Sequence, residues 1–544
     1  MVTYEDEAFD SIIEAMIKDF LKLNPVLGTE LGLHEYDLLA PDLSRESMEL
    51  RITLIKKYIK ELENIDKLKL TGIRAIDYDV VLSRMKEFLV FLEDWPLWRM
   101  YPVGFETVGE MLFPFLIRDH LPLEHRLEAM ESRLKSIDKV ILTSIENVDE
   151  PYRLWLKYVF MVSKGLQQLM DIVKDLGIRN NKPSLSEASE KAMDIISKML
   201  GKLKDMESRA KPGFKPIGYE LFEKLLKLRF IDEDINTLRR IGYEEAKLYK
   251  ELMIKAAKEM NASSIEEAFS RIREKRARSK DEVFRMYKET IDKARKFIIE
   301  RDLVEIPLGE KVMMVETPEY LRPIIPFAAY IPPETFSWSL TGIYLVTPPL
   351  TDEMFKHHNI YDIANTTVHE AYPGHHVQLI YTKLNPYTTR KVIVRAIDAI
   401  EGWAHYCEEL MLEKGFNNTP EYKFKVYHDA LWRAVRVYVD IELSTGMITF
   451  EEAVNKLVKD AYLPREGAYS EALRYTLSPT YQLCYNYGKR RIKKLRKRVK
   501  EILGSKYSDK LFHKLILEEG SLPLSVLEHN VLEKVRKLKL SIAQ

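Results

Sequence analysis

The residues from His369 to His376 concentrate metal-binding chemistry. Their sequence, His-Glu-Ala-Tyr-Pro-Gly-His-His, holds three imidazoles and one carboxylate, and Glu401 follows in a second helical pattern. A hydrolytic zinc site needs neutral imidazoles to hold the ion, an open coordination position for water, and a carboxylate beside that water. These residue types predict a metal-dependent hydrolase.

The spacing of the histidines requires a break in the helix. On an ideal helix His375 would point roughly 120° away from His369, and His376 would lie about 10 Å further along. Neither arrangement lets two imidazoles bind one zinc ion at about 2 Å. Pro373 lacks the N–H of a helical residue, and Gly374 tolerates torsions that other residues resist. We therefore expect a bulged turn that brings His375 or His376 beside His369; the alternative is a helix that ends at Pro373 with polar histidines beyond it.

A second helix, predicted over 388–414, carries further candidates. Glu401, His405 and Glu408 share one face of it, and Glu401 lies far enough after His375 for the chain to turn and return. A carboxylate among apolar neighbours is costly unless it is paired or binds a metal. We expect Glu401 to be the third ligand and Glu408 to orient a ligand imidazole, with a surface position for Glu401 as the alternative.

The segment 474–488 offers groups that could bind substrate. Amide hydrolysis needs a donor for the developing oxyanion, and an arginine can pair with a substrate carboxylate. We assign Tyr485 as the oxyanion donor, Tyr481 as its alternative and a substrate contact, and Arg474 as the carboxylate anchor. The alternative is structural: tyrosines are commonly core residues, and Arg474 could pair with Glu471 one turn earlier.

Composition limits the class of protein. The 544 residues include 84 Lys and Arg and 84 Asp and Glu, so the zero net charge gives no reason to expect nucleic acid or an anionic membrane as partner. Two cysteines make no disulfide framework. The first residues lack a basic start with an apolar core, and no apolar run approaches the ~20 residues that cross a bilayer. These features predict a cytoplasmic protein.

The fold class expected is mostly α, with a small β-sheet before the metal-binding helix. Apolar residues recur at helical spacing over residues 1–300. The segment from about 304 to 350 is rich in proline, β-branched and aromatic residues, which favours two or three short strands. Helices are predicted again over 358–372, 375–384, 388–414, 419–443 and 479–503. We divide the chain into a helical half, 1–303, and a catalytic half, 304–544, within one continuous catalytic domain.

Four motifs give the chain a family resemblance. They are His-Glu-Ala-Tyr-Pro-Gly-His-His-Val-Gln at 369–378, Glu-Gly-Trp-Ala-His-Tyr-Cys-Glu at 401–408, the Arg-Tyr and Pro-x-x-Gln-x-x-Tyr-x-x-Gly pattern at 474–488, and Asn-Pro-Val-Leu-Gly-Thr-Glu-Leu-Gly at 24–32. Together they resemble domain-of-unknown-function family 885 over nearly the whole chain. That family looks like a branch of the gluzincin metallopeptidases, related to carboxypeptidase Taq and angiotensin-converting enzyme. The resemblance implies a large helical fold with a deep cleft between two halves.

The resemblance also implies roles for single residues. His369, His375 and Glu401 would bind one Zn²⁺ per chain, with His376 as the rival of His375, and Glu370 would be the general base. The strand near Gly342 to Tyr344 would be the edge that binds an extended substrate by β-addition. One departure stands out: Ser444 follows Asp440-Ile441-Glu442-Leu443 where many relatives have histidine, so any role of that histidine is absent here or transferred to His405 or His428.

The function expected is a zinc peptidase of carboxypeptidase-like type that cleaves short or unfolded peptides. One alternative is a zinc amidohydrolase acting on a non-peptide amide, and another is a binding or scaffold protein with a decayed metal site. The expected partner is a short peptide or small amide substrate, with a homodimer as the one assembly considered. Sequence alone names neither the substrate nor the direction of cleavage.

Overall fold

The chain folds into two compact units. The computed structural model describes residues 2–318, 322, 325 and 327–543. Unit 1 comprises Met1–Lys215 with two later segments, Pro318–Ile324 and Glu334–Trp338, and unit 2 comprises the remainder, Pro216–Thr317, Ile325–Pro333 and Ser339–Gln544. This division differs from the expected boundary at 303/304, because the helices between 216 and 303 pack with the C-terminal helices.

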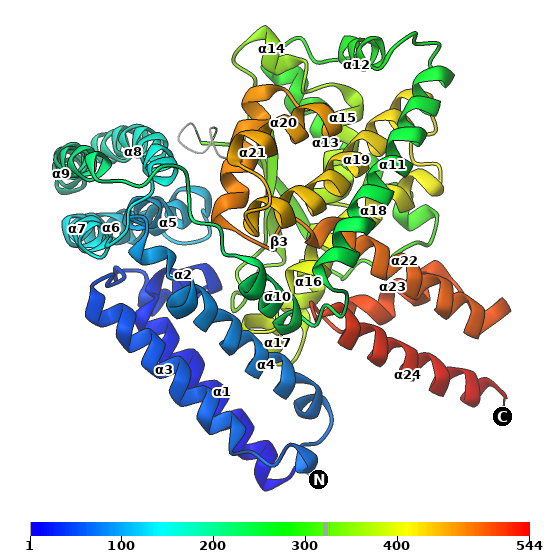
Figure 1. Cartoon of the computed structure of the whole chain (residues 1–544), viewed down its shortest axis with the longest axis horizontal. Coiled ribbons are helices and arrows are strands. Elements are labelled where there is room, and N and C mark those ends of the chain that lie inside the picture. Colours follow the sequence, from blue (N-terminus) through cyan, green and yellow to red (C-terminus); the bar gives the residue numbers. More distant parts are fainter. Residues whose placement is uncertain (1, 319–321, 323–324, 326, 544) are drawn as a thin grey trace. The chain divides into compact units, whose positions relative to one another are not determined.

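Unit 1 is built mostly from amphipathic helices, and the starts of α1 and α3 are fixed by capping side chains. Helix α1 begins with a capping box in which Thr3 and Asp6 exchange hydrogen bonds, and Ser44 caps α3. The long helices α8 and α9 pack along each other (Figure 1). The helices of unit 1 are α1 (Tyr4–Leu23), α2 (Pro25–Leu31), η1 (His34–Tyr36), α3 (Arg45–Glu63), η2 (Lys67–Lys69), α4 (Ile73–Leu89), η3 (Val90–Asp94), η4 (Leu97–Arg99), α5 (Gly104–Ile117), α6 (Leu123–Leu134), α7 (Ile137–Glu146), α8 (Arg153–Arg179) and α9 (Pro183–Ser208).

Unit 2 is also mostly helical and holds the candidate metal ligands. Its longest packed pairs are α11 with α19 and α18 with α22. Its helices are α10 (Tyr219–Leu228), α11 (Ile235–Glu259), α12 (Ile265–Glu274), α13 (Lys280–Glu300), α14 (Asp352–Phe355), α15 (Ile360–Glu370), α16 (His375–Leu384), α17 (Thr388–Val392), α18 (Ile397–Glu413), α19 (Pro420–Ser444), α20 (Phe450–Ala461), α21 (Arg465–Leu477), α22 (Cys484–Leu503), η6 (Gly504–Lys506), α23 (Asp509–Leu517) and α24 (Leu524–Ala543).

A small three-stranded mixed sheet precedes the helices that carry the candidate ligands, as predicted. The strands β1 (Lys311–Glu316), β2 (Ala328–Ile331) and β3 (Thr341–Val346) are arranged in the order β1-β3-β2. The central strand β3 pairs in parallel with β1 and antiparallel with β2, and it is buried except at its first residue.

The sheet order contradicts the expectation that Gly342 to Tyr344 form a free edge. Both residues lie in β3, which has a partner on each side. Tyr344 is 0 % exposed, and the ring of Tyr330 lies over the position that a side chain at Gly342 would take. The edge strand on the site's side of the sheet is therefore β2.

Helix boundaries near the site agree with the sequence only in part. The predicted helix 375–384 coincides with α16. The single helix expected over 388–414 is two helices, α17 and α18, separated where the N–H of Ala396 donates to the carbonyl of Ser521. The helix expected from 479 begins only at Cys484, because residues 478–483 form turns.

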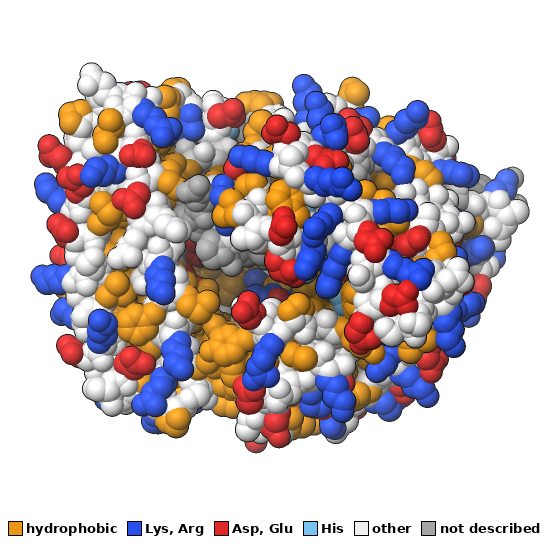
Figure 2. Space-filling model, turned by 90° about the horizontal axis from the view of Figure 1, so that it is seen from above, with side chains coloured by type: hydrophobic (Ala, Val, Ile, Leu, Met, Phe, Trp, Pro, Cys, Tyr) orange, Lys and Arg blue, Asp and Glu red, His pale blue; other side chains and the backbone are white. Residues whose placement is uncertain are grey.

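The surface carries charges of both signs. On the face shown in Figure 2, basic and acidic side chains are interspersed with hydrophobic ones, as the equal counts of 84 predict. Within the described residues, no helix combines the length and hydrophobicity that crossing a membrane requires.

Candidate metal centre

The turn between α15 and α16 brings two histidines together. His369 lies in the last turn of α15, and His375 is the first residue of α16. Between them the chain folds back, so that the N–H of Gly374 donates to the carbonyl of Val368 at 3.0 Å. A Cβ at Gly374 would lie 1.8 Å from the carbonyl oxygen of His369, so only glycine fits. The predicted bulge is confirmed.

Glu401 on α18 completes a group of three ligand atoms. Its Oε2 lies 3.4 Å from Nε2 of His369 and 3.4 Å from Nε2 of His375. Four ligands about 2.1 Å from a tetrahedral ion would be about 3.4 Å apart, so these separations fit a zinc ion. The two imidazole rings are nearly perpendicular, at 89°, and all three residues are under 10 % exposed.

The carboxylate of Glu408 lies behind His369, the first candidate ligand. Nδ1 of His369 lies 2.7 Å from Oε1 of Glu408, which directs Nε2 of the same ring toward Glu401. Glu408 is itself held by Asn365, whose amide donates to Oε2 at 2.9 Å. A carboxylate behind a ligand imidazole is a recurrent feature of metal sites, and Glu408 lies beside His369, as its expected role requires.

The two candidates for the second ligand have different surroundings. His375 belongs to the three-residue group, and its Nδ1 has no hydrogen-bond partner among the described residues. His376 is 0 % exposed and lies between Tyr330, whose hydroxyl is 2.8 Å from Nδ1, and Glu310, which contacts Nε2. The geometry therefore groups His375, rather than His376, with His369 and Glu401.

Glu370, the residue after the first ligand, is fixed by the sheet. The backbone N–H of Tyr330 on β2 donates to its Oε2 at 3.2 Å. Glu370 is the last residue of α15 and is partly exposed, so solvent can reach its carboxylate. This combination of a held orientation and an open side suits a group that exchanges protons with water.

The ligand group has the electrostatics of a cation site. Burial works against a charged imidazole, but hydrogen bonds to Glu401 and Glu408 and the negative charges of Glu408 and Glu370 raise the pKa of His369 to about 10. Burial likewise opposes the charge of Glu401, yet the nearby histidines hold the pKa of that carboxyl well below its usual range. The carboxylates thus favour positive charge at this point, whether a proton or a metal ion supplies it.

Two tyrosines from the 474–488 segment reach this group. The hydroxyl of Tyr481 donates to Oε1 of Glu401 at 2.9 Å, so it holds the ligand carboxylate. The ring of Tyr485 stacks beside that of His369, with 6.3 Å between centroids. Burial and the charge of Glu401 raise the pKa of Tyr485, which keeps its hydroxyl protonated and able to donate.

Arg474 pairs with Glu471, which is the structural alternative that its spacing indicated. Its guanidinium donates to both oxygens of Glu471, at 3.2 and 3.1 Å, and its side chain is 41 % exposed. Glu471 also accepts from Arg436, at 2.9 Å, and from Tyr475. Arg436 is buried and lies over the ring of Tyr485, so it is the arginine closer to the proposed oxyanion donor.

Asp440 shapes the turn that carries Tyr481. Its carboxylate accepts the backbone N–H groups of Thr480 and Gln482, and the hydroxyl of Ser444 donates to it at 2.8 Å. Thr480 has a positive φ of 72°, which a β-branched residue adopts only when its surroundings impose it. Ser444 is thus a positioning residue for this turn.

The two histidines considered as replacements for a histidine at position 444 have other partners. His405 lies 3.3 Å from Glu408, and His428 contacts the carbonyl of Ala461.

A pair of glycines allows α18 and α22 to touch. A Cβ at Gly402 would lie 2.4 Å from Cα of Gly488, and a Cβ at Gly488 would lie 2.1 Å from the carbonyl of Asp398. Gly402 follows the ligand Glu401, and Gly488 follows Tyr485 by one turn. The close contact sets the separation between these two functional side chains.

Three residues that position groups of the candidate site were not predicted from the sequence: Tyr330, Arg436 and Asp440. Tyr330 lies in a short strand forty residues before Glu370, and no local pattern connects them. Arg436 and Asp440 are one turn apart on the buried α19. Charged residues among the apolar ones in the second half of α19 were the available signal, because buried charges are rare unless paired.

The family of the chain follows from comparison with known proteins. Residues 25–531 match the family described as "Bacterial protein of unknown function (DUF885)". The chain belongs to this family. A comparison with curated proteins gives no match.

Two solved structures share the fold. One, from Colwellia psychrerythraea, is 18 % identical with a TM-score of 0.84, covering 99 % of this chain and 100 % of its own. The other, from Shewanella oneidensis, is 21 % identical with a TM-score of 0.77, covering 96 % and 99 %. Both are described as a "putative lipoprotein", and the second as of unknown function. At these identities the similarity shows the fold alone.

Proposed function

We propose that this protein is a zinc-dependent hydrolase that cleaves amide bonds of short or unfolded peptides, as the gluzincin metallopeptidases do. The observation that carries the proposal is the position of Glu401 Oε2, 3.4 Å from Nε2 of both His369 and His375. Glu370 adds a carboxylate directly after the first ligand. A site with three protein ligands leaves a coordination position open, as catalytic zinc sites do.

The chain's own residues would divide the work of hydrolysis. When bound, the ion would polarise the scissile carbonyl and lower the pKa of a nearby water toward ~7. Glu370 takes a proton from the attacking water and passes it to the leaving amine. Tyr485 donates to the oxyanion that develops on the carbonyl. Tyr481 and Glu408 hold the ligands Glu401 and His369 in place.

The outer edge of β2, which pairs with no strand among the described residues, supports an extended peptide as substrate. The N–H of Tyr330 points away from β3, to Glu370. In an antiparallel pair the outward groups recur at every second residue, so the N–H and C=O of Ala328 also face that side. A peptide added along β2 would therefore lie beside the proposed base. We therefore place the bound peptide along Ala328–Tyr330 rather than along Gly342–Tyr344, where the sequence predicted it.

The alternative substrates are non-peptide amides, and the geometry of the ligands suits both classes. The edge strand favours a peptide, because a small amide has no backbone to pair with it. The cytoplasmic location predicted from the sequence remains a prediction, and the two solved relatives described as lipoproteins favour the cell envelope instead.

The first test combines metal analysis with activity. The protein is loaded with zinc, cobalt or manganese and assayed on mixed short peptides with free and amidated carboxy termini. Glu370→Gln should keep the ion at the ligand group and lose turnover by at least ~100-fold, the usual effect of removing a positioned base. Wild-type turnover in this variant would contradict the role of Glu370.

Matched variants separate ligand loss from unfolding. Glu353→Gln changes an exposed glutamate on α14 and should leave turnover unchanged. His375→Ala should abolish both activity and the spectrum of cobalt bound at this site, whereas His376→Gln should keep the cobalt spectrum. If His375→Ala retained that spectrum in folded protein, the assignment of ligands would be wrong.

A further inference from the structure

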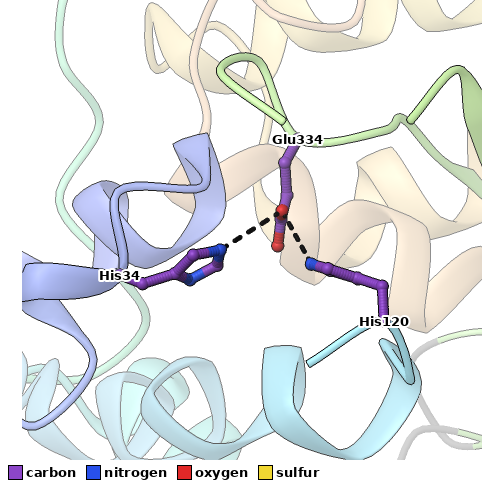
Figure 3. Close-up of side chains that lie close together, drawn as sticks. All are labelled: His34, His120 and Glu334. Carbon is purple, nitrogen blue, oxygen red and sulfur yellow. Dashed lines mark ion pairs between the residues drawn. The ribbon is translucent and has the colours of Figure 1, made fainter. Parts of the chain in front are cut away.

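A second group of ligand atoms lies within unit 1. His34 on η1, His120 in the segment after α5, and Glu334 in the inserted segment Glu334–Trp338 converge on one point (Figure 3). Oε2 of Glu334 lies 2.9 Å from Nε2 of His120 and 3.9 Å from Nε2 of His34. Three segments far apart in sequence thus present two imidazoles and one carboxylate oxygen to each other.

The carboxylate of Glu334 is built into this position. It is 3 % exposed, and its other oxygen, Oε1, accepts from Arg118 at 2.7 Å. Gly32, in the left-handed conformation that ends α2, lets it approach, since a Cβ there would lie 2.9 Å from Cβ of Glu334. The N–H of Phe336 donates to the carbonyl of Leu31 at 2.9 Å. Arg118 therefore leaves Oε2 as the oxygen directed at the histidines.

A second carboxylate stands behind the first histidine. Nδ1 of His34 lies 3.1 Å from Oδ2 of Asp37, which is 0 % exposed and also contacts Nε2 of His125 at 2.8 Å. A proton on Nδ1 facing Asp37 leaves the lone pair of Nε2 directed at Glu334. This is the arrangement of His369, with Glu408 behind it and Glu401 in front, and it recurs in metal sites.

From this geometry we infer that His34, His120 and Glu334 bind a second divalent cation. The same three atoms that could share a proton in hydrogen bonds are close enough to share a metal ion. The two buried carboxylates, Glu334 and Asp37, favour positive charge at this point, which a divalent ion can supply. Two imidazoles and one carboxylate suit zinc and the other late first-row metals rather than calcium or magnesium.

The site differs from the first in its exposure. The side chains of His34 and His120 are 34 % and 39 % exposed, so water can complete the coordination and the ion can exchange. The ion would bind the segment Glu334–Trp338 to η1 and to the chain after α5. Its role is to hold that segment, which lies in sequence between β2 and β3.

The experiment counts metal ions with the first site removed. Zinc is measured in the full-length His369→Ala/Glu401→Ala protein after dialysis against zinc. About one equivalent should remain, and adding His34→Ala and His120→Ala should remove it. His125→Ala is the matched control, because this histidine contacts Asp37 but lies outside the ligand group. A single His120→Ala should weaken zinc binding by more than the ~10–100-fold typical of losing an outer partner.

A second readout needs no variant. In the wild-type protein, chelation should increase hydrogen exchange at the amide of Phe336, and zinc should restore its protection. A folded His369→Ala/Glu401→Ala protein that binds no zinc would overturn the proposal. Equal zinc binding in the His120→Ala and His125→Ala proteins would overturn it as well. Those outcomes would leave protonated histidines as the partners of Glu334. Because neither readout depends on activity, failure here is distinct from failure of the proposed hydrolase function.

Discussion

Each proposed ligand of unit 2 has a neighbour that fixes its orientation, and Glu401 shows the effect most directly. One oxygen faces the two histidines, and the other accepts the hydroxyl of Tyr481. The hydroxyl therefore selects which oxygen would be presented to the proposed ion. The sequence indicated the ligand types through the motif alone, but it could not assign this role to Tyr481, because eighty residues separate the two side chains.

Tyr481→Phe should weaken the metal affinity of the first site by ~10–100-fold, the usual cost of losing a partner behind a ligand. The ring and its packing remain, so the unfolding temperature should change little. Competition with a chelator measures the affinity. Tyr469→Phe, on α21 where the ring packs against Phe450, is the control. Equal affinities in both variants would show that the Tyr481 bond does not orient Glu401.

At the scale of elements, the break between α15 and α16 was predictable and the break before α18 was not. Pro373 and Gly374 indicate the first break, because proline lacks the N–H of a helical residue and glycine tolerates torsions that other residues resist. The second depends on a hydrogen bond from Ala396 to Ser521, a tertiary contact without a local signal. The late start of α22 likewise follows from Asp440, whose contacts with Thr480 and Gln482 are distant in sequence.

Gly374→Ala should destabilise the protein by ~2–3 kcal/mol and abolish metal binding at the first site. The new Cβ would meet backbone oxygens of His369 and Val368 at 1.8 and 2.4 Å, and overpacking of this kind costs about 1–3 kcal/mol. Gly467→Ala is the opposite control: this helical glycine on α21 has open space around it. It should stabilise by about 0.5–1 kcal/mol. Denaturant unfolding and metal analysis measure both variants.

A buried histidine before α15 should make stability fall in acid. His358 is 0 % exposed, neither ring nitrogen has a hydrogen-bond partner among the described residues, and burial lowers its pKa to about 4. Because the pKa is about 6.5 in the unfolded chain, this contribution is fully present above pH 6.5 and is lost as the pH falls toward 4.

His358→Phe should remove that dependence, which amounts to about 3 kcal/mol between pH 6.5 and 4. Free energies of unfolding at pH 7 and pH 4.5 would show a smaller decrease in the variant than in the wild type. His529→Gln, at an exposed position on α24, should keep the wild-type decrease. An unchanged decrease in His358→Phe would mean that His358 does not titrate in this range.

At the scale of the whole molecule, the helical class and the small sheet followed from periodicity, and the division into units did not. The helices from α10 to α13 show the same amphipathic pattern as those before them. Their membership in unit 2 depends on which faces meet, as in the packing of α11 against α19. Periodicity identifies an apolar face but not its partner, so it does not indicate the division into compact units after Lys215.

Substrate size is the prediction that belongs to this scale. His369, His375 and Glu401 are 6 %, 9 % and 8 % exposed, so a scissile bond must reach a buried point. A single extended chain can do so, whereas a loop on a folded protein cannot without unfolding. Quenched fluorescent peptides should be cleaved, and a small folded protein should resist until it is denatured. Cleavage of the native protein at an internal loop would contradict the proposal.

The contact of Gly402 with Gly488 has a mechanical consequence. Where main chain meets main chain, no side chain can rearrange to absorb a displacement, so a sideways shift of α22 is transmitted directly to Glu401. Ion pairs further along add stiffness: Lys489 and Lys493 contact Glu409 on α18. These basic residues at the start of α22 thus help to hold α22 against α18. A displacement of the C-terminal end of α22 would therefore move the carboxylate of Glu401.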